Sequence, residues 1–183
     1  MNLRVSTGQF KNIKLKVPDG TQPVRERIKL AVFSIISDKI INSKCLDLYA
    51  GSGNLGIEAI SRGAVHTTFV DENPLAIKAI TDNIDYIKSK FQNDFTYELK
   101  REDSIKYVTN TNTHYDIVFM DPPYETHTKH ITKYLNEIIE EEGIIIYFHD
   151  INYMIDVESI NTELKIVDSR TYGITRVDFI TKK

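Results

Sequence analysis

Two short stretches of the chain carry residue types that could do chemistry together. The first is LDLYAGSGNLGIEAI, residues 46–60, in which Gly51, Gly53 and Gly56 fit the pattern G-x-G-x-x-G. Glycines permit a positive φ and a close backbone approach to a ligand, and a following helix offers free N–H groups. Asp47, just ahead of the glycines, would repel a pyrophosphate but could attract an ammonium group. The stretch therefore favours a nucleotide-like ligand that has a cationic part.

The second stretch is FMDPPY, residues 119–124. Two prolines make a rigid turn and remove two backbone donors, which leaves the Asp121 carboxylate and the Pro122 carbonyl as acceptors. Tyr124 adds an aromatic face. This set suits a planar base with an exocyclic NH2 group, because two acceptors bind its hydrogens while the ring stacks on tyrosine. The lone pair of the amine would then face an electrophilic sulfonium methyl for an in-line displacement, and Asp121 could take the proton afterwards.

Alternating strands and helices position these two stretches. The predicted strands are short apolar runs, bounded by residues 44–50, 66–71, 95–101, 115–121 and 143–149. Helical patterns begin near Asn54, Pro74, Asp103 and Thr128, and another covers residues 26–40. The alternation predicts an α/β fold with a doubly wound, mostly parallel sheet. Residues 164–183 turn tightly at Gly173 and predict a C-terminal antiparallel hairpin, which brings the Rossmann-like sheet to seven strands.

The amino-terminal region has a different character. Residues 1–22 predict a small β-hairpin extension, with RVS and IKLKV as its strands, ahead of a main domain over residues 23–183. Residues 1–44 contain nine Lys and Arg against three Asp and Glu, whereas the remainder contains fourteen against twenty-three. A basic end on an acidic body predicts that the amino-terminal region meets a polyanion.

The bulk composition excludes some classes of protein. A hydrophobic content of 41% is typical of a globular chain, and no apolar run approaches the roughly 18 residues that span a bilayer. The single cysteine, Cys45, offers no disulfide framework, so we expect a reducing, cytoplasmic location. No convincing set of metal ligands is present, and we expect neither a metal nor a membrane partner.

The glycine stretch by itself suits both NAD and S-adenosylmethionine. Asp71 closes the second predicted strand, where its carboxylate could accept hydrogen bonds from an adenosine ribose in either cofactor. The absence of a lysine after Gly56 excludes a triphosphate P-loop. Asp47 and the FMDPPY stretch favour S-adenosylmethionine, with S-adenosylhomocysteine as product. An NAD-dependent oxidoreductase is a remote alternative.

These stretches resemble a known family over nearly the whole chain. Class I methyltransferases that act on amino groups combine loops like LDLYAGSG with motifs like DPPY. Within that class, LDLYAGSGNLGIEAISRGA, FVDENPLAI and FMDPPY resemble the RsmD family, as do the flanks RVSTGQFKNIKLKVP, TQPVRERIKLAVFSII and YGITRVDF. The resemblance implies transfer of a methyl group to N2 of a guanine in 16S ribosomal RNA, either free RNA or RNA within a small-subunit assembly particle.

The resemblance also implies roles for individual residues. The implied cofactor-binding residues are Asp47, Ala50, Gly51, Ser52, Gly53, Gly56, Asp71, Glu72, Asp103 and Ser104. Asp121, Pro122, Pro123 and Tyr124 would hold the target guanine as the catalytic set. Lys11, Lys14, Lys16, Arg25 and Arg27 would contact the RNA. The chain departs from the family at Gln22, where arginine is usual, and at Asn12, where glycine is usual.

The local motifs alone leave the acceptor open. The same geometry would serve an amino-group methyltransferase that acts on another RNA, on DNA adenine or cytosine, or on a protein glutamine. A DNA enzyme normally needs a sizeable target-recognition region, and 183 residues leave no room for one. The oligomeric state and the nucleotide modified stay open.

Overall fold

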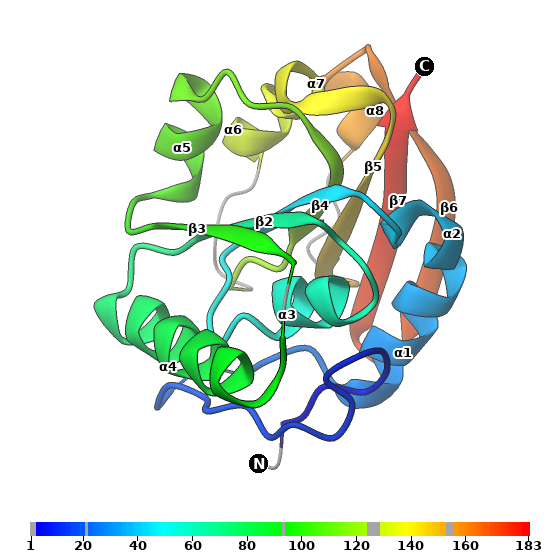
Figure 1. Ribbon diagram of the computed structural model, residues 1–183. Helices are drawn as coiled ribbons and strands as arrows, with labels where there is room; N and C mark the ends of the chain where they lie inside the picture. Colours follow the sequence, from blue (N-terminus) through cyan, green and yellow to red (C-terminus); the bar gives the residue numbers. More distant parts are fainter. Residues whose placement is uncertain (1–2, 21, 93, 124–128, 153–155) are drawn as a thin grey trace.

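The computed structural model describes residues 3–20, 22–92, 94–123, 129–152 and 156–183 (Figure 1). The strands are β1 Lys44–Leu48, β2 His66–Val70, β3 Thr96–Lys100, β4 Tyr115–Met120, β5 Ile139–Asp150, β6 Leu164–Tyr172 and β7 Thr175–Lys182. The helices are α1 Glu26–Ile35, α2 Ser37–Ile40, α3 Asn54–Ser61, α4 Pro74–Lys90, α5 Ser104–Asn110, α6 Lys129–Thr132, α7 Leu135–Ile138 and α8 Val157–Ile160.

The seven strands form one sheet in the order β3-β2-β1-β4-β5-β7-β6. The first five are parallel to one another, and β7 runs antiparallel to both β5 and β6. The turn between β6 and β7 contains Gly173 at φ 66°, where an L side chain would be strained. The predicted α/β class, the seven-stranded sheet and the C-terminal antiparallel hairpin are therefore confirmed.

Helices cover both faces of the sheet, as the parallel strands require. One face packs against α1 to α4 and the other against α5 to α8 (Figure 1). Along β4 the side chains alternate between the two cores: Ile117 and Phe119 face the first, and Val118 and Met120 face the second. Because the central strands, such as β4, are buried on both sides, their sequences are nearly continuous apolar runs.

The predicted amino-terminal β-hairpin is wrong. Within residues 3–20 and 22 the structure contains only one isolated antiparallel bridge, between Arg4 and Lys14. Directly after Val5, Ser6 N and Thr7 N donate to the carboxylate of Glu58 in α3. These bonds replace a strand ladder, so the segment folds onto the helices instead of forming its own sheet. Its separation from residues 23–183 as a domain stays a prediction.

The helical pattern over residues 26–40 is divided in the structure. α1 ends at Ile35 and α2 begins at Ser37, with Ile36 between them at φ −96° and ψ 14°. Ile36 and Ile40 are both buried in the first core. Within the described residues, none of the helices is both long and apolar enough to cross a bilayer.

Candidate active site

The register of the parallel strands brings the two chemical stretches to one edge of the sheet. Leu48 at the end of β1 pairs with Met120 at the end of β4 and with Val70 at the end of β2. The next residues along each chain segment are the glycine loop, Asp121 and Asp71. Ligands of doubly wound sheets bind beyond these carboxyl ends, where neighbouring loops diverge.

A cavity of about 750 Å³ lies at this edge. Its volume is within the range usual for small-molecule sites, roughly 300–1,000 Å³. Most of the residues expected to bind the cofactor line it: Asp47, Ala50, Gly51, Ser52, Asp71, Glu72, Asp103 and Ser104. Asp121, Pro122 and Pro123 line the same cavity. Tyr124, the fourth residue of the expected catalytic set, lies outside the described residues.

Two carboxylates hold the glycine loop in shape. Asp47 is 2% exposed, and its Oδ2 accepts a hydrogen bond from Gly56 N at 2.8 Å. Because Gly53 at the start of α3 has no side chain with which to cap the helix, this carboxylate satisfies one of the free N–H groups. Asp71 Oδ2 accepts from Gly51 N at 2.8 Å, and Asp71 Oδ1 accepts from Asn73 N at 2.9 Å. Both carboxylates therefore stabilise the conformation of the glycine loop.

The three glycines of the loop serve different physical needs. Gly51 has φ 55° and Gly53 has φ 74°, a backbone conformation that L side chains rarely adopt. Gly53 and Gly56 do not line the cavity. A Cβ at Gly56 would lie 2.3 Å from Cε1 of the Phe69 ring, so this glycine allows α3 to approach β2 closely. Only the first glycine combines a left-handed backbone with a place in the cavity wall.

Asp103 and Ser104 stand at the start of α5. Asp103 caps this helix, since its Oδ1 accepts from Lys106 N at 2.9 Å. The hydroxyl of Tyr49, a cavity residue that the sequence analysis missed, lies beside Ser104. Tyr49 has φ 58°, and burial raises the pKa of its hydroxyl to about 12. A non-glycine residue in this conformation often marks a functional site, and its only sequence signal is an aromatic residue at a strand end.

Asp121 differs from Asp47, Asp71 and Asp103, the carboxylates of the cavity that accept backbone hydrogen bonds. Desolvation raises the pKa of its carboxyl to about 7. Among the described residues no hydrogen bond to Asp121 offsets that effect. Burial also raises the pKa of Asp47 well above its usual value, and the charges of Asp121 and Asp71 act in the same direction. A carboxylate with a pKa near neutrality can both accept hydrogen bonds and take up a proton.

The charge of the cavity decides which nucleotide it favours. The described lining residues include Asp47, Asp71, Glu72, Asp103 and Asp121, and no lysine or arginine. A pyrophosphate would be repelled, whereas a sulfonium and an ammonium group would be attracted. Ser52 adds a second observation: its Oγ is buried and lacks a hydrogen-bond partner among the described residues. The acidic lining and this unpaired hydroxyl fit S-adenosylmethionine.

The basic residues expected to contact RNA lie on the surface. Lys11, Lys14, Arg25 and Arg27 are exposed. Lys16 is also exposed, and its Nζ forms an ion pair with Asp82 at 3.0 Å. Arg25 directly follows Val24, which lines the cavity together with Gln22 and Pro23. Contact of these five residues with RNA stays a prediction.

Comparison with known proteins decides the family. The family model described as "Conserved hypothetical protein 95" matches residues 3–181. The chain belongs to this family. It is 31% identical over 186 residues to the YlbH protein of Bacillus subtilis, covering 99% of this chain and 100% of that protein. It is 30% identical over 124 residues to "Ribosomal RNA small subunit methyltransferase D" of Escherichia coli, covering 67% of this chain and 60% of that protein.

A solved structure agrees with the fold. The Escherichia coli protein yhhF superposes with a TM-score of 0.87 at 23% identity, covering 100% of this chain and 99% of that one. The sheet order, with the antiparallel strand β7 between β5 and β6, is that of the Rossmann-like methyltransferase fold. The resemblance to the RsmD family is therefore confirmed, and the protein is a methyltransferase of this family, with S-adenosylmethionine as the cofactor of the class.

Proposed function

We propose that this methyltransferase transfers a methyl group from S-adenosylmethionine to the exocyclic N2 amine of a guanine in small-subunit ribosomal RNA. The observation that carries the proposal is that Gly51 and Asp121 line one cavity. The first belongs to the loop expected to hold the cofactor, and the second to the turn expected to hold an amino group. Transfer requires these two groups within bonding range of each other.

The turn at the end of β4 would orient the acceptor. The cofactor, when bound, supplies an electrophilic methyl group. The Asp121 carboxylate and the Pro122 carbonyl accept the two hydrogens of the base amine and direct the nitrogen lone pair toward that methyl group. The methylated ammonium product is acidic, and Asp121, with a pKa of about 7, can accept its proton near neutral pH.

Several features support ribosomal RNA as the substrate. The Escherichia coli relative is named as a ribosomal RNA methyltransferase, and YlbH carries a provisional name of the same kind. The exposed lysines and arginines of residues 11–27 provide charge for phosphates beside the cavity. A guanine paired within a helix cannot reach the cavity, so the target must lie in a loop or be flipped out. By family resemblance, the target is of the class at position 966 of 16S ribosomal RNA.

Methyl transfer to separate substrate pools tests the proposal. The purified protein is incubated with tritiated S-adenosylmethionine and with 16S RNA, assembling small subunits, DNA or total protein. We expect label in guanine N2 of the ribosomal RNA, mapped by primer-extension stops. Label in DNA or in glutamine would show that the acceptor is different, while the methyl-transfer reaction is the same. Binding of NAD with no affinity for S-adenosylhomocysteine would overturn the proposal entirely.

A further inference from the structure

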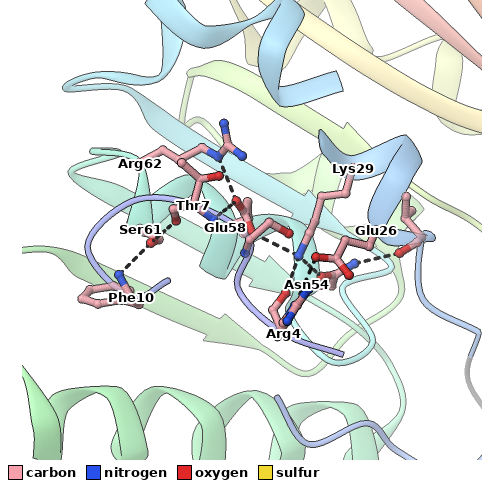
Figure 2. Close-up of polar contacts among 12 residues, drawn as sticks. Arg4, Thr7, Phe10, Glu26, Lys29, Asn54, Glu58, Ser61 and Arg62 are labelled. Carbon is pink, nitrogen blue, oxygen red and sulfur yellow. Dashed lines mark hydrogen bonds and ion pairs between the residues drawn. The ribbon is translucent and has the colours of Figure 1, made fainter. Parts of the chain in front are cut away.

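A buried lysine connects α1 to the start of the glycine-loop helix (Figure 2). The side chain of Lys29 is fully buried, and its Nζ lies 3.0 Å from Glu58 Oε2 in an ion pair. The same ammonium donates to Arg4 O and to Asn54 Oδ1, each at 2.8 Å. Burial lowers the pKa of Lys29, and the charge of Glu58 opposes this shift. A buried ammonium with three acceptors is fixed in position, because losing any one of them is costly.

Glu58 extends the same network to the amino-terminal segment. Its carboxylate accepts from Ser6 N at 2.7 Å and from Thr7 N at 3.1 Å. Arg62, the residue directly after α3, donates to Glu58 Oε1 at 2.9 Å. Figure 2 shows these groups converging on one carboxylate between α1, α3 and the chain near Arg4. The network therefore fixes α1 and the amino-terminal segment to α3.

Asn54 brings this network to the cavity wall. It is the first residue of α3, directly after Gly53, and it lines the cavity. Its Oδ1 accepts from Lys29, while its Nδ2 donates to Val24 O at 3.2 Å. Both polar atoms of the side chain thus bond to other protein groups. Asn54 therefore contributes to the cavity by joining α3 to Lys29 and to the backbone at Val24. Gln22, Pro23 and Val24 form a second wall of that cavity, on a separate segment of chain.

We propose that Asn54 is a positioning residue that holds the wall of residues 22–24 against the glycine loop and thereby sets the affinity for the cofactor. The residue type follows from the contacts. The oxygen must accept from a buried ammonium, and the nitrogen must donate to a buried carbonyl on the other wall. Aspartate could pair with Lys29 but would present an oxygen to the Val24 carbonyl. This inference rests on the proposed function, because it takes S-adenosylmethionine as the occupant of the cavity.

Two substitutions at Asn54 separate positioning from folding. Asn54→Ala removes both contacts. Asn54→Asp keeps an acceptor for Lys29 and breaks the bond to Val24 O, and its added negative charge would by itself favour a cationic ligand. It provides a second test if the alanine variant fails to fold. The matched control is Asn161→Ala. Asn161 is also buried, its Nδ2 donates to Thr132 O at 3.3 Å and to Lys133 O at 3.1 Å, and it does not line the cavity.

Calorimetry with S-adenosylhomocysteine gives the first measurement. We expect Asn54→Asp to weaken binding on the order of tenfold, as loss of one buried hydrogen bond predicts. The KM for S-adenosylmethionine should rise by a similar factor, while kcat stays within about twofold. Asn161→Ala should lower the melting temperature and leave affinity unchanged. The inference is overturned if Asn54→Asp binds within about twofold of the wild type, or if Asn161→Ala weakens binding equally.

Hydrogen exchange of peptides covering residues 22–28 gives the second measurement. In protein without ligand, Asn54→Asp should speed exchange in these peptides relative to the wild type, whereas Asn161→Ala should not. If the wild type fails to bind S-adenosylhomocysteine, the proposed function fails. The exchange experiment still decides whether Asn54 holds this wall, so the two failures are distinguishable. Unchanged exchange in Asn54→Asp would overturn the positioning role.

Discussion

The two sides of the cavity differ in what their carboxylates bind. On the side of β1 to β3, Asp47 and Asp71 accept hydrogen bonds from backbone N–H groups of the glycine loop and its neighbour. Asp103 accepts one from the first turn of α5. On the side of β4, Asp121 has no hydrogen-bond partner among the described residues, and desolvation raises its pKa to about 7.

This difference separates residues that build the cavity from one that is available for chemistry. A carboxylate already bonded to the backbone contributes to the shape of a loop. A desolvated carboxylate without such bonds costs stability and persists where function needs it. Changes that remove a backbone contact on the loop side should therefore alter folding and cofactor affinity, and changes at Asp121 should alter turnover.

The largest expected effect comes from Asp121→Ala. Loss of one of the two acceptors for the base amine should lower kcat on the order of 10³-fold. Affinity for S-adenosylhomocysteine, measured by calorimetry, should stay within about threefold. Methylation at the wild-type rate by this variant would remove Asp121 from the mechanism.

The isosteric substitution Asp121→Asn tests the desolvation of this carboxylate through the stability of the protein. The folded-state pKa of Asp121 is raised, so its contribution to stability is fully present below the unfolded pKa near 4 and is lost as pH rises through about 7. The asparagine variant should therefore be more stable than the wild type at about pH 8, and the difference should vanish near pH 4. Thermal unfolding at the two pH values measures this. Equal stability at pH 8 would show that the carboxylate is not desolvated.

Substituting alanine for two glycines of the loop should destabilise the fold for different reasons. Gly56→Ala drives a Cβ into the Phe69 ring and should destabilise the fold by roughly 2–3 kcal/mol. Gly51→Ala meets no atom closer than 3.9 Å, so its cost is backbone strain of about 1–2 kcal/mol. Denaturant unfolding of both variants compares them. A smaller loss for Gly56→Ala than for Gly51→Ala would contradict the packing explanation.

The pH dependence of kcat/KM should follow the ionisation of the Asp121 carboxyl group. Because the ionised carboxylate accepts the amine hydrogens, the rate should rise by about tenfold between pH 6 and pH 8, with a midpoint near 7. The residual activity of Asp121→Asn should not show this rise. Initial rates with RNA well below its KM measure both profiles, and a profile that falls over this range would reverse the assigned protonation state.

The smallest effect is expected for Asp47→Asn. An amide oxygen can still accept from Gly56 N, and loss of the buried charge removes a desolvation cost. Stability should change by less than about 1 kcal/mol, and affinity for S-adenosylhomocysteine should fall by no more than about threefold. A loss of affinity as large as a hundredfold would mean that Asp47 contacts the ammonium group directly. Calorimetry decides between these.

Much of the site could be predicted because its parts follow strands directly. Asp71 and Asp121 close buried apolar runs, and parallel strands place all such ends at one edge. The amino-terminal hairpin could not be predicted correctly, because alternating residues also suit a segment that donates its N–H groups to Glu58. Asn54 and Tyr49 were missed for a related reason: neither type carries a chemical signal until its partners, Val24 and Ser104, are in contact.

The sequence by itself determined the strands, the glycine loop, the rigid acidic turn and the family, since each depends on residues close together along the chain. Only the tertiary structure decided which carboxylates accept hydrogen bonds from the backbone and which one is available to bind the substrate. Hydrogen-bond partners and desolvation depend on groups distant in sequence, such as Gly56 for Asp47 and Glu58 for Lys29. In this fold Asp47, Asp71 and Asp103 accept backbone hydrogen bonds, whereas Asp121 is desolvated and has no hydrogen-bond partner among the described residues.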